Sequence, residues 1–226
     1  KRQTIVRHIK PSRPVATLNV AGWWDQEDFF GPIAIYKERE KYDSAVLNLL
    51  VVGPWHHGGW NRAEGDKLGD IEFGSATSRH FREKIQAPFF AYYLKNSGTL
   101  RQPEALVFAP GANQWREWSA WPPVTGVSQK KLYFQPNGGL SFEPPATSPD
   151  TIDQYVSDPS KPVPYRARPI QWTYDPRGSN WFTWLLADQR FVHNRPDVLS
   201  YETPPLAEDV EIAGEVMANL FASTSG

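Results

Sequence analysis

The sequence predicts two regions of different fold class, an α/β layer followed by an all-β region. In about the first 100 residues, strand-like and helix-like segments alternate, which is typical of a parallel sheet covered by helices. After that point, short apolar runs are separated by proline-rich connectors, which favours a β-sandwich or jelly roll. We therefore expect one domain over residues 1–100 and a second over 101–226, with the boundary in 96–103.

Four segments make up the predicted α/β layer. Residues 15–21 predict a short buried strand, and 44–53 predict a second strand that is apolar enough to be covered on both faces. Residues 31–43 predict a helix, because Pro32 suits a first turn and is followed by apolar and then charged residues. Residues 77–97 predict a second helix, which completes the order strand, helix, strand, helix.

The second predicted helix has a regular apolar face. Four large apolar side chains recur at four-residue steps, at Phe81, Ile85, Phe89 and Tyr93. Pro88 is expected to kink this helix, and Gly98 stands where a glycine commonly ends one.

The all-β region is predicted from four strand-like runs. They cover residues 103–110, 130–136, 153–159 and 209–223, and Asn-Gly-Gly at 137–139 is typical of a hairpin turn.

Composition excludes several classes of function. The formal net charge of −1 gives no bulk attraction to nucleic acid or to an anionic membrane surface, so we expect neither partner. The chain has no cysteine, which removes disulfides, thiolate metal sites and cysteine nucleophiles. The chain begins at Lys1 without Met and ends within a strand-like run, so we expect a piece of a larger protein, incomplete at both ends.

Two side chains that could act together follow the two predicted strands. Asp25 follows the first strand by a few positions, and His57 follows the second by a similar distance. Functional residues of an open α/β sheet collect at the carboxyl ends of its strands, so the two side chains are expected to meet. A carboxylate that bonds a histidine ring nitrogen fixes its tautomer and stabilises the imidazolium formed in general-base catalysis.

Asp25 and His57 would make up two-thirds of a Ser-His-Asp triad. In the order Ser, Asp, His, the serine would precede both, but no G-x-S-x-G elbow occurs in the chain. We therefore expect the nucleophile to lie upstream of Lys1.

The segments "AGWWDQEDFFG" and "GPWHHGG" resemble the Asp and His motifs of the S15-type CocE/NonD serine hydrolases. That family includes X-prolyl dipeptidyl peptidases, cocaine esterase and the α-amino acid ester hydrolases, and the D-Q-E-D sequence resembles the last group most. The resemblance implies the C-terminal part of an α/β-hydrolase domain followed by a jelly roll. It selects His57 rather than His56 as the base, with Asp25 as its partner.

The resemblance also implies a substrate. In the α-amino acid ester hydrolases, acids that match Glu27 and Asp28 hold the α-ammonium group, so we expect a small ester or amide that carries an α-amino group, including β-lactam acyl groups. The serine and the oxyanion-hole tyrosine would again lie upstream. No cofactor or metal is expected. Members of the family are often exported and some form homo-oligomers, although no residue of this chain indicates either property.

Other interpretations remain open at this stage. Asp25 could cap the following helix, Glu27 and Asp28 could form a solvated acidic turn, and the adjacent histidines could bind zinc, although they lack a convergent spacing. Trp23 and Trp24 could line an acyl pocket or simply pack.

The whole protein could also act differently. An X-Pro dipeptidyl peptidase or a glutaryl-type acylase would use the same catalytic residues. An esterase for neutral acyl groups would have no use for Glu27 and Asp28. The alternative from another class is a non-catalytic, aromatic-rich β-sandwich module, in which residues 113–121 and 180–184 could stack on sugars.

Overall fold

The computed structural model describes residues 5–10, 15–43, 48–146, 152–170, 172–175 and 178–225. The chain divides into two compact units. The first contains residues up to Val127 together with the segment from Glu211 onward, and the second runs from Ser128 to Val210.

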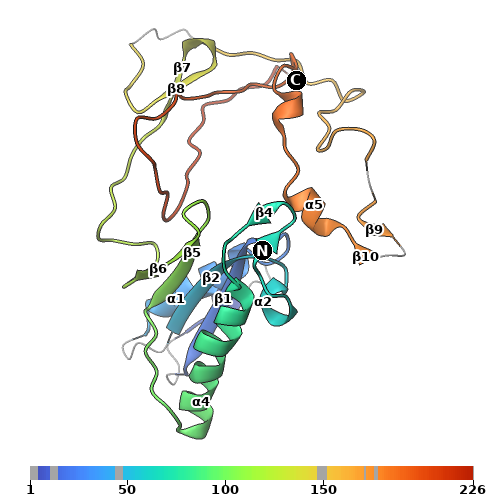
Figure 1. Cartoon of the computed structure of the whole chain (residues 1–226). Helices are drawn as coiled ribbons and strands as arrows, with labels where there is room; N and C mark the ends of the chain where they lie inside the picture. The colour runs from blue at the N-terminus through green and yellow to red at the C-terminus, as the bar shows by residue number, and fades with distance from the viewer. Residues whose placement is uncertain are drawn as a thin grey trace. The chain divides into compact units, whose positions relative to one another are not determined.

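A four-stranded sheet forms the centre of the first unit (Figure 1). Its strand order is β1-β2-β5-β6; the first three strands are parallel, and β6 pairs antiparallel with β5. The strands are β1 (Thr17–Trp24), β2 (Asn48–His56), β5 (Ala105–Ala109) and β6 (Gln114–Trp118). Every residue of β2 except His56 is buried, as expected for a strand covered on both faces.

Helices cover both faces of this sheet, because successive side chains of a strand point to opposite sides. On one face, Tyr36 of α1 (Phe30–Glu40) packs in a cluster with Leu50 and Val52 of β2. On the other face, Val51 packs with Phe81 and Ile85 of the second helical segment. The α/β layer predicted for the first part of the chain is therefore present.

The second helical segment consists of α3 (Thr77–His80), the π-helical turn η2 (Phe81–Gln86) and α4 (Ala87–Lys95). Pro88, where a kink was predicted, has no N–H to donate to an i−4 carbonyl. It is the second residue of α4, two positions after the widened turn ends. The predicted end at Gly98 was wrong. Asn96 adopts the left-handed conformation (φ 53°) instead, and its N–H bonds the carbonyl of Ala91.

Smaller elements complete the first unit. They are η1 (Ile5–His8), α2 (Gly59–Arg62) and the two-stranded hairpin of β3 (Lys67–Leu68) and β4 (Ile71–Glu72). The start of the second predicted strand, residues 44–47, lies outside the described residues.

The sheet continues past the boundary expected near residue 100. β5 pairs with β2 through Leu50 and Ala105, and β6 then pairs with β5, so both belong to the first compact unit. Trp121 extends the same core. Residues 209–223, expected as a strand, are irregular in the structure.

The second unit contains short elements. β7 (Tyr133–Gln135) and β8 (Gly139–Ser141) form a hairpin through the turn η3 (Pro136–Gly138), in which Asn137 and Gly138 have positive φ, so the Asn-Gly-Gly turn is confirmed. The remaining elements are β9 (Tyr174–Asp175), β10 (Gly178–Ser179), α5 (Trp181–Leu185) and η4 (Arg190–Val192). Residues 153–159 form no strand, and the described part of this unit contains no two-sheet sandwich.

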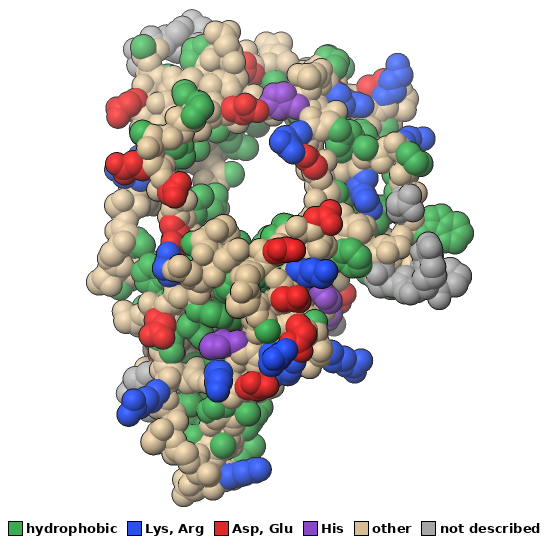
Figure 2. Space-filling view, viewed as in Figure 1, with side chains coloured by type: hydrophobic (Ala, Val, Ile, Leu, Met, Phe, Trp, Pro, Cys, Tyr) green, Lys and Arg blue, Asp and Glu red, His purple; other side chains and the backbone are tan. Residues whose placement is uncertain are grey.

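The surface carries both signs of charge. On the face shown in Figure 2, acidic and basic side chains are interspersed, in line with the formal net charge of −1. Among the residues described, no helix combines the length and the apolar character needed to cross a bilayer.

Candidate active site

The carboxylate of Asp25 is fixed at the carboxyl end of β1 by hydrogen bonds from nearby backbone N–H groups. It directly follows Trp24, and its side chain is only 1% exposed. Its Oδ1 accepts hydrogen bonds from the backbone N–H groups of Glu27 and Asp28, both at 2.8 Å. Asp25 therefore orders the turn before α1, while its carboxylate still faces a second partner. The interpretation of Asp25 as a helix cap was wrong, because the N-cap of α1 is Phe29 and no side chain caps it.

That partner is His57, the residue after β2. Its Nδ1 lies 3.1 Å from each carboxylate oxygen of Asp25. The contact arises because β1 and β2 are adjacent and parallel, so that their carboxyl ends reach the same edge of the sheet. The expected meeting of the two side chains is present, and the side chain that meets Asp25 is that of His57.

The geometry determines the role of each ring nitrogen. Because a carboxylate only accepts hydrogen bonds, we assign the proton of the neutral ring to Nδ1, which leaves the lone pair on Nε2. The ring is 38% exposed, so a reactant can approach it. This is the arrangement of a general base with an orienting acid.

The surrounding acids favour the protonated ring. Desolvation is the largest single influence and lowers the pKa of His57, but it is outweighed by the hydrogen bond and charge of Asp25 and by the charges of Glu27 and Asp28. The net result is a pKa of His57 above its ordinary value of 6.5. The site therefore stabilises the positive charge of the imidazolium.

Glu27 and Asp28 stand on either side of the His57 ring. Their side chains are 61% and 65% exposed, and they lie 3.8 Å from Nε2 and 3.7 Å from Nδ1, respectively. In the described part of the chain, His57 is the only basic side chain recorded within 4.0 Å of either carboxylate. Glu27 therefore borders Nε2, the ring nitrogen that would take a proton, and Asp28 lies beside Nδ1; both carboxylates are largely unneutralised.

The two tryptophans before Asp25 have packing partners. The indole N–H of Trp23 donates to the carbonyl of Phe108 at 2.7 Å, and its ring contacts Phe29 and Trp121. Trp24 contacts Phe73, at 5.8 Å between ring centroids. These contacts support the packing interpretation over a role as acyl-pocket walls.

The aromatic stretches proposed as sugar platforms also pack. Trp115 of β6 contacts Trp55 and Phe108, and Trp121 belongs to the core. Residues 181–185 form helix α5, so this stretch is not a flat β platform. As for zinc, the described residues contain no group of three or more His, Asp or Glu side chains able to hold a metal.

Two residues support the segment before His57: Trp55, a tryptophan of the His motif with an expected packing role, and Thr77, which the sequence did not indicate. Trp55 hydrogen-bonds Thr77, and both side chains are buried, while Gly22 and Gly53 leave room for the Trp55 residue. The glycines and tryptophans of the two motifs were the signals in the sequence, and Thr77, 20 residues beyond His57, gave none.

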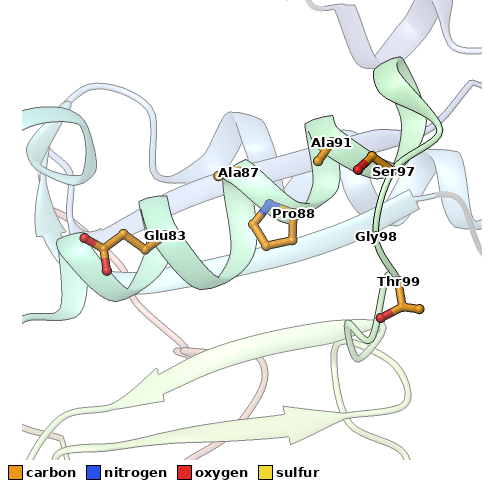
Figure 3. Close-up of a pocket in the computed structure, with 7 residues that line it drawn as sticks. All are labelled: Glu83, Ala87, Pro88, Ala91, Ser97, Gly98 and Thr99. Carbon is orange, nitrogen blue, oxygen red and sulfur yellow. The ribbon is translucent and has the colours of Figure 1, made fainter.

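A separate groove of the first unit lies away from these residues. It is bordered by Glu83, Ala87, Pro88 and Ala91 of the long helical segment and by the turn at Ser97, Gly98 and Thr99 (Figure 3). Asp25, Glu27, Asp28 and His57 are not among its lining residues, so the groove and the acid-histidine site are distinct.

Comparison with known proteins places the chain among hydrolases. Residues 97–226 match the family described as X-Pro dipeptidyl-peptidase C-terminal non-catalytic domain. The chain is 30% identical over 219 residues to a cocaine esterase of Rhodococcus sp. (strain MB1 Bresler), and the match covers 92% of this chain and 35% of the relative.

Two solved structures agree with this result. A selenomethionine-labelled alpha-amino acid ester hydrolase has a TM-score of 0.82 and 39% identity over 93% of this chain and 34% of its own. An aminopeptidase from a marine sediment archaeon, Thaumarchaeota archaeon, has a TM-score of 0.79 and 40% identity over 88% of this chain and 32% of its own. The chain spans about a third of the length of these relatives.

The chain belongs to the S15-type CocE/NonD family of hydrolases. Within it, residues 97–226 correspond to the C-terminal non-catalytic domain. Asp25 and His57 both precede that region, so the non-catalytic description does not apply to the residues of the candidate site.

Proposed function

We propose that this protein supplies the acid and the base of a serine hydrolase that cleaves esters or amides of α-amino acids. His57 takes the proton of the attacking serine through Nε2 and then gives it to the leaving group. Asp25 holds the ring by Nδ1 and stabilises the imidazolium formed in between. The contact of Nδ1 with both oxygens of Asp25, at 3.1 Å, is the observation that carries this proposal.

The serine is proposed to come from polypeptide outside these 226 residues. Two facts support this: the chain contains no G-x-S-x-G elbow, and its relatives are about three times as long. The 226-residue protein alone is therefore expected not to turn over an ester.

The proposed substrate carries an ammonium group next to the scissile carbonyl. Glu27 and Asp28 are exposed, border the reactive ring and lack a Lys or Arg partner among the described residues. A cationic amine would relieve the repulsion between these carboxylates, which a neutral substrate cannot do. The names of two relatives, an alpha-amino acid ester hydrolase and an aminopeptidase, agree with a substrate of this kind.

The experiment that tests the proposed function compares His57→Ala with His56→Ala in the complete hydrolase. Loss of the base is expected to lower kcat by several orders of magnitude, as triad losses do. The adjacent histidine is the matched control and is expected to leave kcat within a few-fold of the wild type. Activity that survives His57→Ala would refute the assignment.

An X-Pro dipeptidyl peptidase or a glutaryl-type acylase would use the same pair of residues. These activities are separated by the substrate, so the complete hydrolase is to be assayed with an α-amino ester, its des-amino analogue, an X-Pro dipeptide amide and a glutaryl amide. Preference for the α-amino ester supports the proposed substrate class. A non-catalytic sugar-binding module is not favoured, because Trp115 and Trp121 pack inside the first unit.

We propose in addition that the region after β6 contributes to a jelly roll in the complete protein. The family match over 97–226 and the β7–β8 hairpin support this. The strand-like runs at 153–159 and 209–223 would then pair there. Slow amide exchange of these two runs in the complete protein is the expected result, and rapid exchange would contradict it.

A further inference from the structure

The ring of Trp55, two residues before His57, is buried among other aromatic rings. It is 2% exposed and contacts Trp60, Phe81 and Trp115 at centroid distances of 6.0, 5.3 and 5.9 Å. Its indole N–H donates to the hydroxyl of Thr77 at 2.9 Å. A single rotamer of this ring is therefore enforced by packing and by one directional bond.

Thr77 is itself fixed by a second bond. Its hydroxyl donates to the carbonyl of Gly65 at 2.6 Å, and its residue is fully buried. Because one hydroxyl accepts from Trp55 and donates to Gly65, it is used in both directions. The anchor of Trp55 thus extends to the loop between α2 and β3.

Two glycines leave the space that this arrangement needs. A Cβ added to Gly53 would lie 2.4 Å from Cζ2 of the Trp55 ring, so the ring folds back over its own strand. A Cβ on Gly22 would lie 2.3 Å from the carbonyl oxygen of Trp55. Close approach of backbone and ring at both places requires glycine.

The two strands change register at this point. Gly22 pairs with Gly53, and the next pair is Trp24 with His56, so one residue on β1 is opposite two on β2. Trp55 is one of these two residues of β2. Such a bulge bends the strand and redirects the residues that follow, here the segment that carries His57 toward Asp25.

From this geometry we propose that Trp55 and Thr77 are positioning residues for His57. The hydrogen bond between them stabilises the bulge at the end of β2. The bulge in turn orients the imidazole of His57 toward the Asp25 carboxylate. The inference builds on the proposed roles of Asp25 and His57, but it concerns their geometry and can be tested without measuring activity.

The test uses Thr77→Val and Thr77→Ser in the 226-residue protein, with the His57 ring titrated by NMR. Valine matches the shape of threonine but loses the hydroxyl, so the anchor is lost while the packing remains. Serine keeps the hydroxyl and is the matched control. Thr77→Val is expected to lower the pKa of His57 toward 6.5 and to weaken the Nδ1–H resonance, whereas Thr77→Ser titrates as the wild type.

A folded Thr77→Val protein in which His57 titrates as in the wild type would overturn the proposal. Should Thr77→Val fail to fold, Trp55→Phe tests the same bond, because phenylalanine keeps an aromatic ring and removes the N–H donor. An unchanged His57 titration in Trp55→Phe would overturn the proposal equally. If instead the titration moves as expected but the complete hydrolase keeps its activity in His57→Ala, the positioning role stands and the proposed function fails.

Discussion

Replacing Asp25 with Asn removes the charge that faces His57 and keeps the local structure. The amide oxygen of Asn can still accept the N–H groups of Glu27 and Asp28, which Asp25 bonds at 2.8 Å, so the turn is expected to remain folded. What is lost is the attraction between the carboxylate and the imidazolium that forms during catalysis. An Asn side chain also presents N–H to Nδ1, which favours the wrong tautomer of the ring.

The size of the effect follows from the distance. At 3.1 Å and an effective dielectric constant of about 20, which suits a side chain as buried as Asp25, the two charges attract by about 5 kcal/mol. This corresponds to a loss of about four orders of magnitude in kcat. If the pair were fully screened by water, the attraction would be about 1 kcal/mol and the loss about tenfold.

The assay is steady-state hydrolysis of an α-amino ester by the complete hydrolase, with thermal unfolding measured in parallel. A folded Asp25→Asn variant that loses less than about tenfold in kcat would refute the reasoning, because even a solvent-screened pair would cost more.

Three further predictions concern the acids of the first unit. Glu27→Gln with Asp28→Asn is expected to raise KM by about tenfold for an α-amino ester and to leave KM for its des-amino analogue unchanged; an unchanged preference between the two esters would remove the ammonium-binding role. The same double variant removes two charges that raise the pKa of His57, so the acid limb of the pH profile of kcat/KM moves to lower pH; a limb that stays in place would show that these charges do not act on the base. Glu104 accepts a hydrogen bond from Tyr36, and burial raises the pKa of Glu104 from 4.5 to about 7. The folded state therefore binds the proton of Glu104 more tightly than the unfolded chain does. The free energy of unfolding is therefore expected to fall by about 1 to 2 kcal/mol between pH 4.5 and 7, after a discount for partial exposure. In denaturant titrations, Glu104→Gln should abolish that fall. An equal fall in the variant would contradict this prediction.

The parts of the site that sequence could predict were those fixed by local pattern. The apolar run that became β2 indicated a strand covered on both faces, and parallel neighbours bring their carboxyl ends together. Asp25 and His57 were therefore expected to meet, and they do, at 3.1 Å. The Asn-Gly-Gly hairpin and the buried positions Phe81, Ile85 and Phe89 followed from equally local rules.

The parts that sequence could not predict depend on contacts between distant residues. The apolar run of β5 would suit a sandwich strand as well as a strand beside β2, because the pattern of one strand does not identify its neighbour. The aromatic residues at 180–184 were considered as a sugar-stacking platform, but Trp181–Leu185 forms a helix. The bond between Trp55 and Thr77 joins residues 22 positions apart, and no local signal marks the threonine.

The most direct test of the central claim is the titration of His57 by NMR in the wild-type 226-residue protein and in Asp25→Asn. We predict a neutral ring protonated on Nδ1, a pKa of His57 above 6.5, and a lower pKa when the carboxylate is removed. A neutral ring protonated on Nε2, or a titration that the Asp25 substitution leaves unchanged, would contradict it.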